Sequence, residues 1–425
     1  MEILFYIEEV SKKMKVYISE ESKQSLHMAG LSGLYWFVAA IGCYQTIFLQ
    51  NMGFTATNIG VLNALCSVIG IGAMSFWGIY VDSKNSVRRT EVLLLIGCLV
   101  FYSLMPFVRN VFGNAIWPYF ILCPICVLFR NPVGTFHENL IVRNCNELRL
   151  NYGRIRSIGS ILFAVSATFL VVLIPVENTF WIYGLGLIPV ILLTMVSRDP
   201  QGGPIRKKGG KVPLGELFQN RTYVMFLIFA FLFYIGVNFE GAFIPYYMKE
   251  VGIDTSKFSL LLALRAMFEV PFLLLMVKLR HKFSLRSLIL ISPILMAIEC
   301  LGFGLIVRSW TGMLFFASFF GLGNGMFIGT SLNYVYEISP DDAKASAQAF
   351  FASTSQIAAI LGNLTGGWIL DMVGGRRFYL VAAALYLISI VMFVLSGRVK
   401  AKSDAQIKQK AKAISRIKLL AKPVH

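Results

Sequence analysis

Long apolar runs recur along the whole chain, and they constrain its fold more than any other feature. Each run approaches the roughly 20 residues that an α-helix needs to cross a lipid bilayer. The segments expected to span a membrane are residues 28–50, 58–80, 91–110, 115–140, 154–175, 178–197, 222–248, 258–279, 285–308, 310–336, 344–370 and 377–397. These twelve segments predict an all-α membrane protein with twelve transmembrane helices.

Composition agrees with this prediction. Of the 425 residues, 56% are hydrophobic and 14% are charged, whereas a soluble domain carries roughly 25% charged residues. The sequence contains no G-x-S-x-G, H-E-x-x-H or P-loop motif, so the usual motifs of hydrolases, metalloproteases and nucleotide-binding enzymes are missing. We therefore expect a multi-pass membrane protein that is not an enzyme and that holds no metal and no cofactor.

The net charge of +17 could indicate nucleic-acid binding, but the placement of the basic residues indicates a membrane instead. Seventeen Lys and Arg residues fall in one alternate set of loops and six in the other. Cytoplasmic loops carry such an excess of basic residues. Both termini are therefore expected in the cytoplasm and the protein in the plasma membrane. Its expected partners are the lipid bilayer and a small-molecule substrate, without nucleic acid, and the expected oligomeric state is a monomer.

A basic linker separates the twelve segments into two groups of six. It contains DPQGGPIRKKGGKVP, and such Gly- and Pro-rich stretches form loops rather than packed elements. The sequences SVRR (86–89) and SLRS (284–287) occupy matching loops of the two halves. Such a layout is typical of a transporter whose site lies between two bundles. The predicted parts are an N-terminal segment (1–27), a six-helix bundle (28–197), the linker (198–221), a second six-helix bundle (222–397) and a basic tail (398–425).

The two terminal segments each allow two interpretations. Residues 1–25 mix charged residues with apolar ones at helical spacing, so they either lie along the membrane surface or are disordered. The basic tail either contacts anionic lipid headgroups or stays in solution. Cys123 and Cys126 form a C-x-x-C in an apolar span, and we interpret them as small core residues because a metal or redox site needs more polar neighbours.

Two glycine-containing patterns bear on conformational change. Gly321, Gly325 and Gly329 recur at four-residue intervals, which favours close helix packing, with a hinge as the alternative. After the second span, the residues Gly78, Asp82, Arg88 and Arg89 form a G-x-x-x-D…R-R pattern. An Asp at the inner end of a helix can pair with cations there and hold one conformation shut, so these four residues are expected to act in gating. This pattern resembles the signature loop of the major facilitator superfamily.

Ionisable residues inside the spans are the main indication of function. A charged side chain near the bilayer centre costs roughly 2.5–3.5 kcal/mol, so such residues usually have a specific role. His137 is expected to be a core histidine rather than a proton carrier. Glu138 and Arg156 either join two helices or bind a polar solute between them. The full set is Arg130, His137, Glu138 and Arg156 in the first half and Glu240, Arg265, Glu269 and Glu299 in the second.

In the second half, Arg265 and Glu269 lie four residues apart on one predicted helix, so they are expected to pair with each other. Glu240 and Glu299 are then left without a local cation. A buried carboxylate without a partner suits a group that takes up and releases a proton. Our hypothesis is that Glu269 binds substrate while Glu240 or Glu299 carries the proton. The alternative is that these acids only cross-link helices.

The segment from Glu138 through NYGRIRSIGSILF (151–163) resembles helices four and five of the lactose permease group, the oligosaccharide:proton symporters. In that family a Glu and an Arg at the same 18-residue separation hold the sugar hydroxyls, and they correspond here to Glu138 and Arg156. A carboxylate and a guanidinium together provide acceptors and a rigid fork of donors, which suits vicinal hydroxyls. The motif around the Arg is completed by Gly153, Arg154 and Gly159. The resemblance also implies substrate contacts from Tyr44, Phe163, Glu269 and Gln356.

The resemblance is weakest where that family couples sugar to protons. Its helix-ten Lys, His and Glu correspond to Phe316, Phe319 and Leu322, and its helix-nine Arg corresponds to Glu299. Either the proton path consists of Glu240, Glu269, Glu299 and Arg265, or transport is not coupled to protons. Arg130 is a further departure, and it is expected to contact substrate or to pair with a carboxylate of another helix.

The resemblance therefore implies a major facilitator fold and a secondary active transporter. The expected substrate is a small hydroxylated solute, a sugar or glycoside, imported by proton symport with alternating access. One alternative is a transporter of an organic or aromatic acid, as in the related phenylpropionate transporters, where Arg130, Arg156 and Arg265 would hold the carboxylate. A second alternative is a membrane sensor or scaffold that does not transport.

Overall fold

The computed structural model describes residues 2–84, 86–170, 173–199, 214–340 and 344–395. The side chains of the first helix are described from Ser22 onward. Three features that were assigned a role above lie outside this part of the chain. They are the basic tail, most of the linker and the side chain of Asp82.

The first half of the chain forms one series of helices. It comprises α1 (Glu2–Ile41), η1 (Gly42–Tyr44), α2 (Gln45–Asn51), α3 (Ala56–Lys84), α4 (Val87–Ser103), α5 (Met105–Phe112), α6 (Tyr119–Glu147), α7 (Tyr152–Val165), η2 (Ser166–Leu170), η4 (Val176–Asn178) and α8 (Thr179–Val196). The second half comprises α9 (Leu214–Gln219), α10 (Arg221–Glu250), η5 (Thr255–Lys257), α11 (Phe258–Lys282), α12 (Leu285–Leu305), α13 (Trp310–Ile338), α14 (Lys344–Val373) and α15 (Gly375–Leu395).

Every segment expected to span the membrane overlaps one or more of these helices. Over the described residues, ten helical segments are long and apolar enough to cross a membrane. The other two positions are taken by α11 and by α14, whose Ser, Thr, Asn and Gln side chains make it more polar. The predicted all-α fold of twelve transmembrane helices is thus confirmed. The backbone of α1 is continuous from Glu2, so residues 2–25 extend the first spanning helix instead of forming a separate element.

Local sequence explains where several helices begin. Ser86 starts α4 by accepting a hydrogen bond from the backbone N–H of Arg89, and Ser284 starts α12 in the same way from Ser287. These two serines are the first residues of the matching sequences SVRR and SLRS, so the resemblance between the halves reflects equivalent helix starts. A serine at this position satisfies one of the backbone donors that a helix end leaves unpaired.

The end of the linker is more ordered than its Gly- and Pro-rich composition suggests. Residues Leu214–Gln219 form the short helix α9, which packs against α10. The side chain of Leu217 is fully buried there. An apolar side chain that leaves water in this way gains stability, so the linker is anchored to the second bundle before α10 begins.

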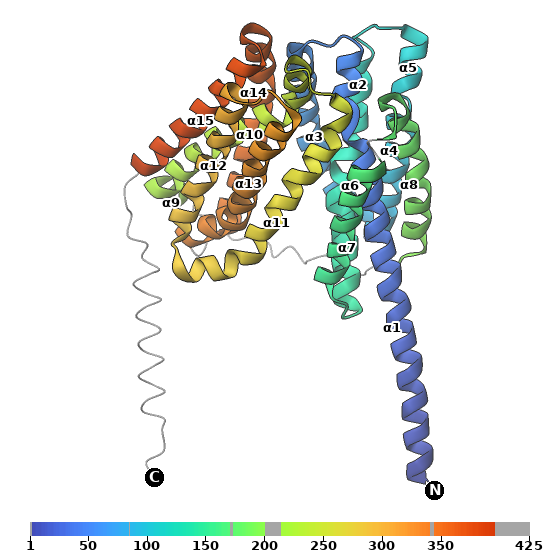
Figure 1. The fold of residues 1–425 in the computed structure, drawn as a ribbon. Coiled ribbons are helices and arrows are strands. Elements are labelled where there is room, and N and C mark those ends of the chain that lie inside the picture. Colours follow the sequence, from blue (N-terminus) through green and yellow to red (C-terminus); the bar gives the residue numbers. More distant parts are fainter. Residues whose placement is uncertain (1, 85, 171–172, 200–213, 341–343, 396–425) are drawn as a thin grey trace, which may run out of the picture.

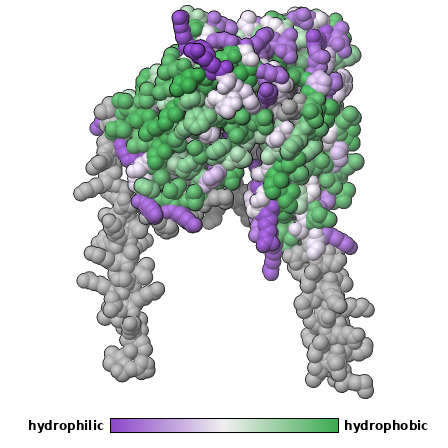
Figure 2. All heavy atoms as spheres, in the orientation of Figure 1, coloured by the Kyte–Doolittle hydropathy of each residue, from purple (hydrophilic) through white to green (hydrophobic). Residues whose placement is uncertain are grey.

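The helices pack as two bundles that lie side by side (Figure 1). In the first bundle α1 packs against α7 and α8, while α4 packs against α6 and α8. In the second bundle α13 packs against α11 and α12, and α15 packs against α10 and α12. The largest contact between the bundles is made by α3 and α14. The face of the bundles seen in Figure 2 is largely apolar, as expected of a surface that faces lipid.

The two bundles meet on one side of the molecule and separate on the other (Figure 1). We call the upper side in Figure 1, where α2 and the end of α14 lie, the closed side. The opposite side, where α1 begins and α11 ends, is the open side, and Figure 2 shows the space between the bundles there.

Hydrogen bonds between the bundles hold the closed side together. The hydroxyl of Tyr246 donates to the carbonyl of Phe54 at 2.6 Å. The backbone N–H of Thr57 donates to the Asp371 carboxylate at 2.6 Å. Further contacts join Tyr44 to Ser256, Gln50 to Pro245, Ala56 to Asp371 and Ser259 to Ala167.

The glycine pattern of α13 serves close packing. A Cβ atom at Gly325 would lie 2.6 Å from the carbonyl oxygen of Glu269 and 2.9 Å from its Cα. A Cβ at Gly321 would lie 2.8 Å from the Cβ of Phe268 on the same neighbouring helix, α11. These distances leave no room for a side chain, so the glycines allow α11 and α13 to approach closely.

Candidate solute-binding site

Glu138 and Arg156 form an ion pair between α6 and α7. The Nε atom of Arg156 lies 2.8 Å from Oε1 of Glu138. Asn151 starts α7 by accepting a hydrogen bond from the backbone N–H of Arg154, which fixes the register that places Arg156 opposite Glu138. The Arg156 and Glu138 side chains remain 32% and 26% exposed, so a small polar molecule can reach both of them.

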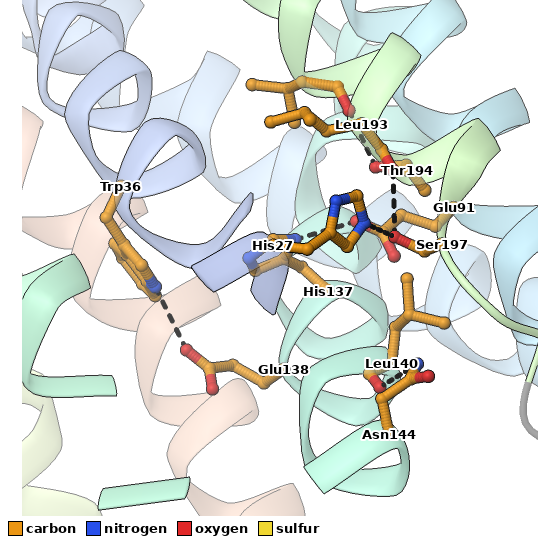
Figure 3. Close-up of polar contacts among 11 residues, drawn as sticks. His27, Trp36, Glu91, His137, Glu138, Leu140, Asn144, Leu193, Thr194 and Ser197 are labelled. Atoms are coloured by element: carbon orange, nitrogen blue, oxygen red, sulfur yellow. Dashed lines mark hydrogen bonds and ion pairs between the residues drawn. The ribbon is translucent and has the colours of Figure 1, made fainter. Parts of the chain in front are cut away.

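Two aromatic residues that the sequence analysis missed complete this pair. The indole N–H of Trp36 on α1 donates to Oε1 of Glu138 at 3.1 Å, and the hydroxyl of Tyr152 donates to Oε2 at 2.6 Å (Figure 3 shows the former). The guanidinium carbon of Arg156 lies 4.3 Å from the centre of the Trp36 ring. Trp36 falls within the first predicted span and Tyr152 directly precedes the Arg motif, but neither position alone indicates a site.

Phe163 lies behind Trp36. The two rings contact edge to face, with their centres 6.3 Å apart. The aromatic surface next to the ion pair is therefore that of Trp36. Phe163, which the resemblance placed against the sugar, supports the Trp36 ring in this conformation.

A polar cavity of about 450 Å³ lies between α14 and helices of the first bundle. Arg130, Gly134 and Glu138 are spaced four residues apart on α6, so they share one face of that helix, and this face runs from the cavity to the ion pair. Gln356 on α14 lines the cavity from the other bundle, where the resemblance placed a substrate contact. The complete lining is Tyr35, Asn63, Cys66, Ser67, Val127, Arg130, Asn131, Gly134, Gln356 and Asn363.

Arg130 is held at the break between α1 and η1. Its guanidinium donates to the carbonyl of Gly42 at 2.6 Å and to Oε1 of Gln45 at 3.1 Å, and it lies 4.7 Å from the centre of the Tyr102 ring. The Gly42 carbonyl also accepts a hydrogen bond from the Tyr102 hydroxyl. Within the described residues, no carboxylate lies within ion-pair distance of Arg130. Its expected pairing with a carboxylate of another helix is therefore not formed in this conformation.

Arg265 pairs across helices rather than with Glu269. It contacts Glu299 on α12 and lies 3.4 Å from Oε2 of Glu240 on α10. The expected pair on one helix is thus wrong, and so is the expectation that Glu240 and Glu299 lack a cation. A four-residue spacing permits pairing but does not require it, and two carboxylates from neighbouring helices occupy the guanidinium instead.

The Arg265 cluster is sealed inside the second bundle. Glu240 and Glu299 are fully buried. The hydroxyl of Tyr386 donates to Oε1 of Glu240 at 2.7 Å, and the Cys300 thiol lies 3.2 Å from the same oxygen. Arg265 also packs over the Phe320 ring at 4.0 Å. The cluster holds two carboxylates and one guanidinium.

Glu269 is half-buried on the face of α11 next to α13. It accepts a hydrogen bond from the side-chain amide of Asn324 at 2.8 Å. No cation pairs with it within the part of the chain that the structure describes. Glu269 is therefore available to a solute, whereas Glu240 and Glu299 are not.

Tyr44 is not in the cavity. Its side chain is 1% exposed, and its hydroxyl donates to the carbonyl of Ser256 at 2.6 Å and to the Ser259 hydroxyl at 3.0 Å. Both partners belong to the other bundle. The expected substrate contact is therefore wrong in this conformation. The reason is the break at Gly42–Tyr44, which directs the ring into the closed side.

The expected gating residues lie on the open side. Arg88 donates through its side chain to the carbonyl of Ser197 at 3.0 Å and through its backbone to Asp199 at 3.2 Å. These contacts tie the start of α4 to the end of α8 within one bundle. Arg89 is exposed, and no heavy atom lies within 4 Å of a Cβ built at Gly78. Among the described side chains of this pattern, Arg88 therefore makes its hydrogen bonds within the first bundle in this conformation, and the pairing expected of Asp82 lies outside the described residues.

His137 and Glu91 form a buried pair in the first bundle. Nδ1 of His137 lies 2.8 Å from Oε1 of Glu91, and both side chains have no exposed area (Figure 3). Glu91 was missed because it is the first residue of a predicted span and lies only two residues after Arg89. Cys123 and Cys126 are buried and free. Across the described chain, no group of His, Cys, Asp and Glu residues could hold a metal ion.

Comparisons with known proteins agree with this architecture. A family model described as "MFS_1 like family" matches residues 28–381. An uncharacterized transporter, YwbF of Bacillus subtilis, is 25% identical over 377 residues, covering 85% of this chain and 90% of that protein. The maltose permease of Geobacillus stearothermophilus is 23% identical over 348 residues, covering 80% and 84%.

Solved structures share the fold at low sequence identity. A single-residue mutant of the nucleoside transporter NupG superposes with a TM-score of 0.78 at 15% identity, covering 88% of this chain and all of that one. A bacterial homologue of the human lysosomal transporter Spinster, in an inward-facing and unoccupied conformation, gives 0.60 at 14% identity, covering 88% and 96%. The chain therefore belongs to the MFS_1 like family and is a membrane transporter of the major facilitator type.

Proposed function

We propose that this transporter imports a small hydroxylated solute, a sugar or glycoside, by proton symport. The observation that carries the proposal is the partly exposed Glu138–Arg156 pair beside the Trp36 ring. Carboxylate oxygens accept hydrogen bonds from hydroxyls, and a guanidinium donates to them from a rigid fork. The Trp36 ring adds a flat apolar surface for the C–H face of a sugar ring.

Exposure distinguishes this pair from a purely structural one. The Arg265 cluster shows what an ion pair inside a bundle looks like here, because its side chains are 4% exposed or less. The Glu138 and Arg156 side chains keep roughly a quarter to a third of their area exposed. Breaking a buried pair costs far more than breaking an exposed one. An accessible pair beside a polar cavity therefore favours binding over cross-linking.

The contacts of the closed side support alternating access. Among the described residues, the hydrogen bonds that join the two bundles in this conformation lie on the closed side, which leaves the site accessible from the other side. The excess of basic residues in alternate loops supports a cytoplasmic location for the open side. The conformation would then be inward-facing, and the opposite one forms when the closed-side hydrogen bonds break and the open side closes.

Glu240, Glu299 and Arg265 are our proposed proton-coupling residues. With both carboxylates ionised, this buried cluster carries one uncompensated negative charge, and one bound proton makes it neutral. Because the two acids interact strongly, the bound proton is shared by the pair and cannot be assigned to one of them alone. Glu269 completes the proposal as the acid that binds the solute. It lies on α11, the helix that also carries Arg265 of the cluster. The relative named maltose permease supports a sugar as the solute.

Arg130 favours a second candidate function, the transport of an organic or aromatic acid. It lines the cavity and has only neutral partners among the described residues. A carboxylate of a solute could therefore bind it in a charge-assisted manner. In that case Arg130, rather than the Glu138–Arg156 pair, would provide the main contact.

One solute panel tests both candidates. Purified protein is screened for thermal stabilisation against neutral mono- and disaccharides, glycosides and aromatic acids, since a ligand stabilises the fold according to its occupancy. Uptake of each stabilising solute is then measured in proteoliposomes with and without a proton gradient. Gradient-dependent uptake of a neutral sugar supports the proposal, and uptake of an acid supports the second candidate. If no solute stabilises the protein or enters the vesicles, the sensor or scaffold alternative is favoured.

A further inference from the structure

We propose that Glu91 and His137 form a proton-binding site in the first bundle and that its protonation state alters the Glu138–Arg156 site. This site is separate from the Arg265 cluster of the second bundle. The inference goes beyond the proposed transport function and does not depend on the identity of the solute.

The geometry of the dyad allows two charge states. Nδ1 of His137 and Oε1 of Glu91 lie 2.8 Å apart, which is a hydrogen-bond distance for a neutral or a protonated imidazole. With one proton between the two groups the dyad is negatively charged, and with two protons it is neutral. Both side chains have no exposed area, so neither state is screened by water.

The surroundings leave both states open. Nε2 of His137 and Oε2 of Glu91 are buried and have no hydrogen-bond partner within the described residues. A partner that accepts at Nε2 would fix the imidazolium, and a donor at Nε2 would fix the neutral ring. Because neither kind of partner is present among the described residues, the neighbouring groups favour neither the state with one proton nor the state with two. A histidine with only a structural role usually has both ring nitrogens satisfied.

Consecutive residues connect the dyad to the proposed solute site. The His137 ring stacks on Tyr35 of α1, with ring centres 3.9 Å apart and planes at 21°. The next residues, Trp36 and Glu138, are joined by the hydrogen bond at 3.1 Å. Tyr35 also lines the cavity, so its ring contacts both His137 and the cavity. A charge on His137 therefore lies one residue along α6 from Glu138, the partner of Trp36 in the α1–α6 hydrogen bond (Figure 3).

Other charged and titratable groups surround this region. The helices packed around the dyad contribute Tyr35 from α1, Cys66 from α3, Cys98 from α4, Arg130 and Glu138 from α6, Tyr152 and Arg156 from α7, and Tyr183 from α8. The tyrosines and cysteines are neutral near pH 7. Arg130 is positive, as are Arg88 and Arg89, which lie two to three residues before Glu91 on α4, while the Glu138–Arg156 pair is balanced. Positive charge therefore partly offsets the negative state of the dyad.

Nuclear magnetic resonance of the intact protein in lipid nanodiscs tests the proposal. The four histidine rings and the six tryptophan indoles are labelled with ¹⁵N, and the signals of His137 and Trp36 are assigned with His137→Gln and Trp36→Phe. We expect the His137 ring and the Trp36 indole to change together between pH 5 and 9. In Glu91→Gln, which keeps a hydrogen-bonding amide but removes the carboxylate, the joint change of the two signals should be lost.

The control variants separate this site from the rest of the protein. His27→Gln changes another histidine, which lies on α1 and whose ring contacts the Ser197 hydroxyl. This variant should leave the pH response of the His137 and Trp36 signals unchanged. Glu240→Gln, in the second bundle, should also leave it unchanged. If Glu91→Gln does not fold, His137→Gln gives the deciding measurement, since the Trp36 signal should then lose its pH dependence. A His137 ring that stays in one state from pH 5 to 9 would overturn the proposal, and so would a Trp36 indole indifferent to both substitutions.

Discussion

Asp371 of α14 accepts a hydrogen bond from the backbone N–H of Thr57, at the start of α3, with 2.6 Å between Oδ2 and the nitrogen. Its other oxygen accepts from the N–H of Ala56 at 3.1 Å. A side chain of one bundle therefore satisfies the unpaired donors at the start of a helix in the other. A carboxylate at a helix N-terminus is also favoured by the helix dipole. This contact exists only while the closed side is shut.

We predict that Asp371→Ala shifts the protein towards opening of the closed side. Losing such a cap costs about 1 kcal/mol, which is roughly a fivefold change in the equilibrium. Spin labels at the exposed positions Asn114 and Arg308 would report a longer distance by double electron–electron resonance. Glu177→Gln is the matched control because Glu177 pairs with Arg109 within one bundle. An unchanged distance distribution in Asp371→Ala would show that the cap does not hold the side shut.

Side-chain volume at the crossing of α3 and α14 should have a stronger effect. A Cβ at Gly367 would lie 2.8 Å from the carbonyl carbon of Ala56 and 3.1 Å from the Cα of Thr57. Because these are backbone atoms, they cannot move aside without separating the helices. We expect Gly367→Val to keep the closed side open in most molecules, measured with the same labels. Gly72→Val on α3, where a Cβ meets nothing within 4 Å, should leave the distance unchanged.

Substitutions at the ion pair should strongly weaken solute binding while the protein stays folded. Arg156→Lys keeps the charge but loses the fork of donors, and Glu138→Gln keeps the shape but loses the charge. Hydrogen bonds to charged groups contribute roughly 1.5–3 kcal/mol each, so affinity should fall by about 10- to 100-fold. The check is calorimetric titration with the solute that the panel identifies. Arg154→Lys, at an exposed position on the same helix, is the control, and binding that survives both substitutions would assign the pair a structural role.

Removing the central cation of the second bundle should destabilise the fold. Arg265→Gln leaves Glu240 and Glu299 buried without their partner, which costs about 3–5 kcal/mol. We expect a clearly lower melting temperature, largely restored in the triple variant Arg265→Gln/Glu240→Gln/Glu299→Gln because no unpaired charge then remains. The measurement is thermal unfolding in detergent. If Arg265→Gln alone were as stable as the parent protein, water would have to reach the cluster.

The same carboxylates should carry the coupling. In Glu240→Gln and Glu299→Gln, solute binding should continue while solute-induced proton uptake is lost, because one of the acids that share the proton is missing. In Glu269→Gln, solute binding itself should weaken. Proton uptake is followed with a pH-sensitive dye in weakly buffered detergent solution. Coupling that is unchanged in all three variants would exclude these residues as the proton carriers.

The sequence predicts the fold well because a bilayer imposes a simple rule. A backbone segment in lipid must satisfy its own hydrogen bonds, so apolar length translates directly into helices. The Glu138–Arg156 contact is also predictable, since a helical hairpin brings residues near its turn together. The short turn between α6 and α7 leaves few alternatives for two charges on neighbouring spans.

Contacts between helices that are distant in the sequence are the part that sequence reasoning misses. Arg265 has Glu269 one turn away, yet its partners come from α10 and α12, whose positions the spacing of one helix cannot indicate. Tyr44 lies on the closed side because α1 breaks at Gly42, and no proline marks this break. Glu91 is hidden because a carboxylate beside Arg88 and Arg89 looks like part of a solvated loop.

The closed side has a consequence for sequence variation in this family. Several of its hydrogen bonds end on main-chain atoms, namely the carbonyls of Phe54, Pro245 and Ser256 and the amides of Ala56 and Thr57. Main-chain atoms are supplied by almost any amino acid at these positions. Homologues can therefore carry different side chains at the residues that contribute only main-chain atoms and still keep the closed-side hydrogen bonds. Their cavities can meanwhile diverge to accept different solutes.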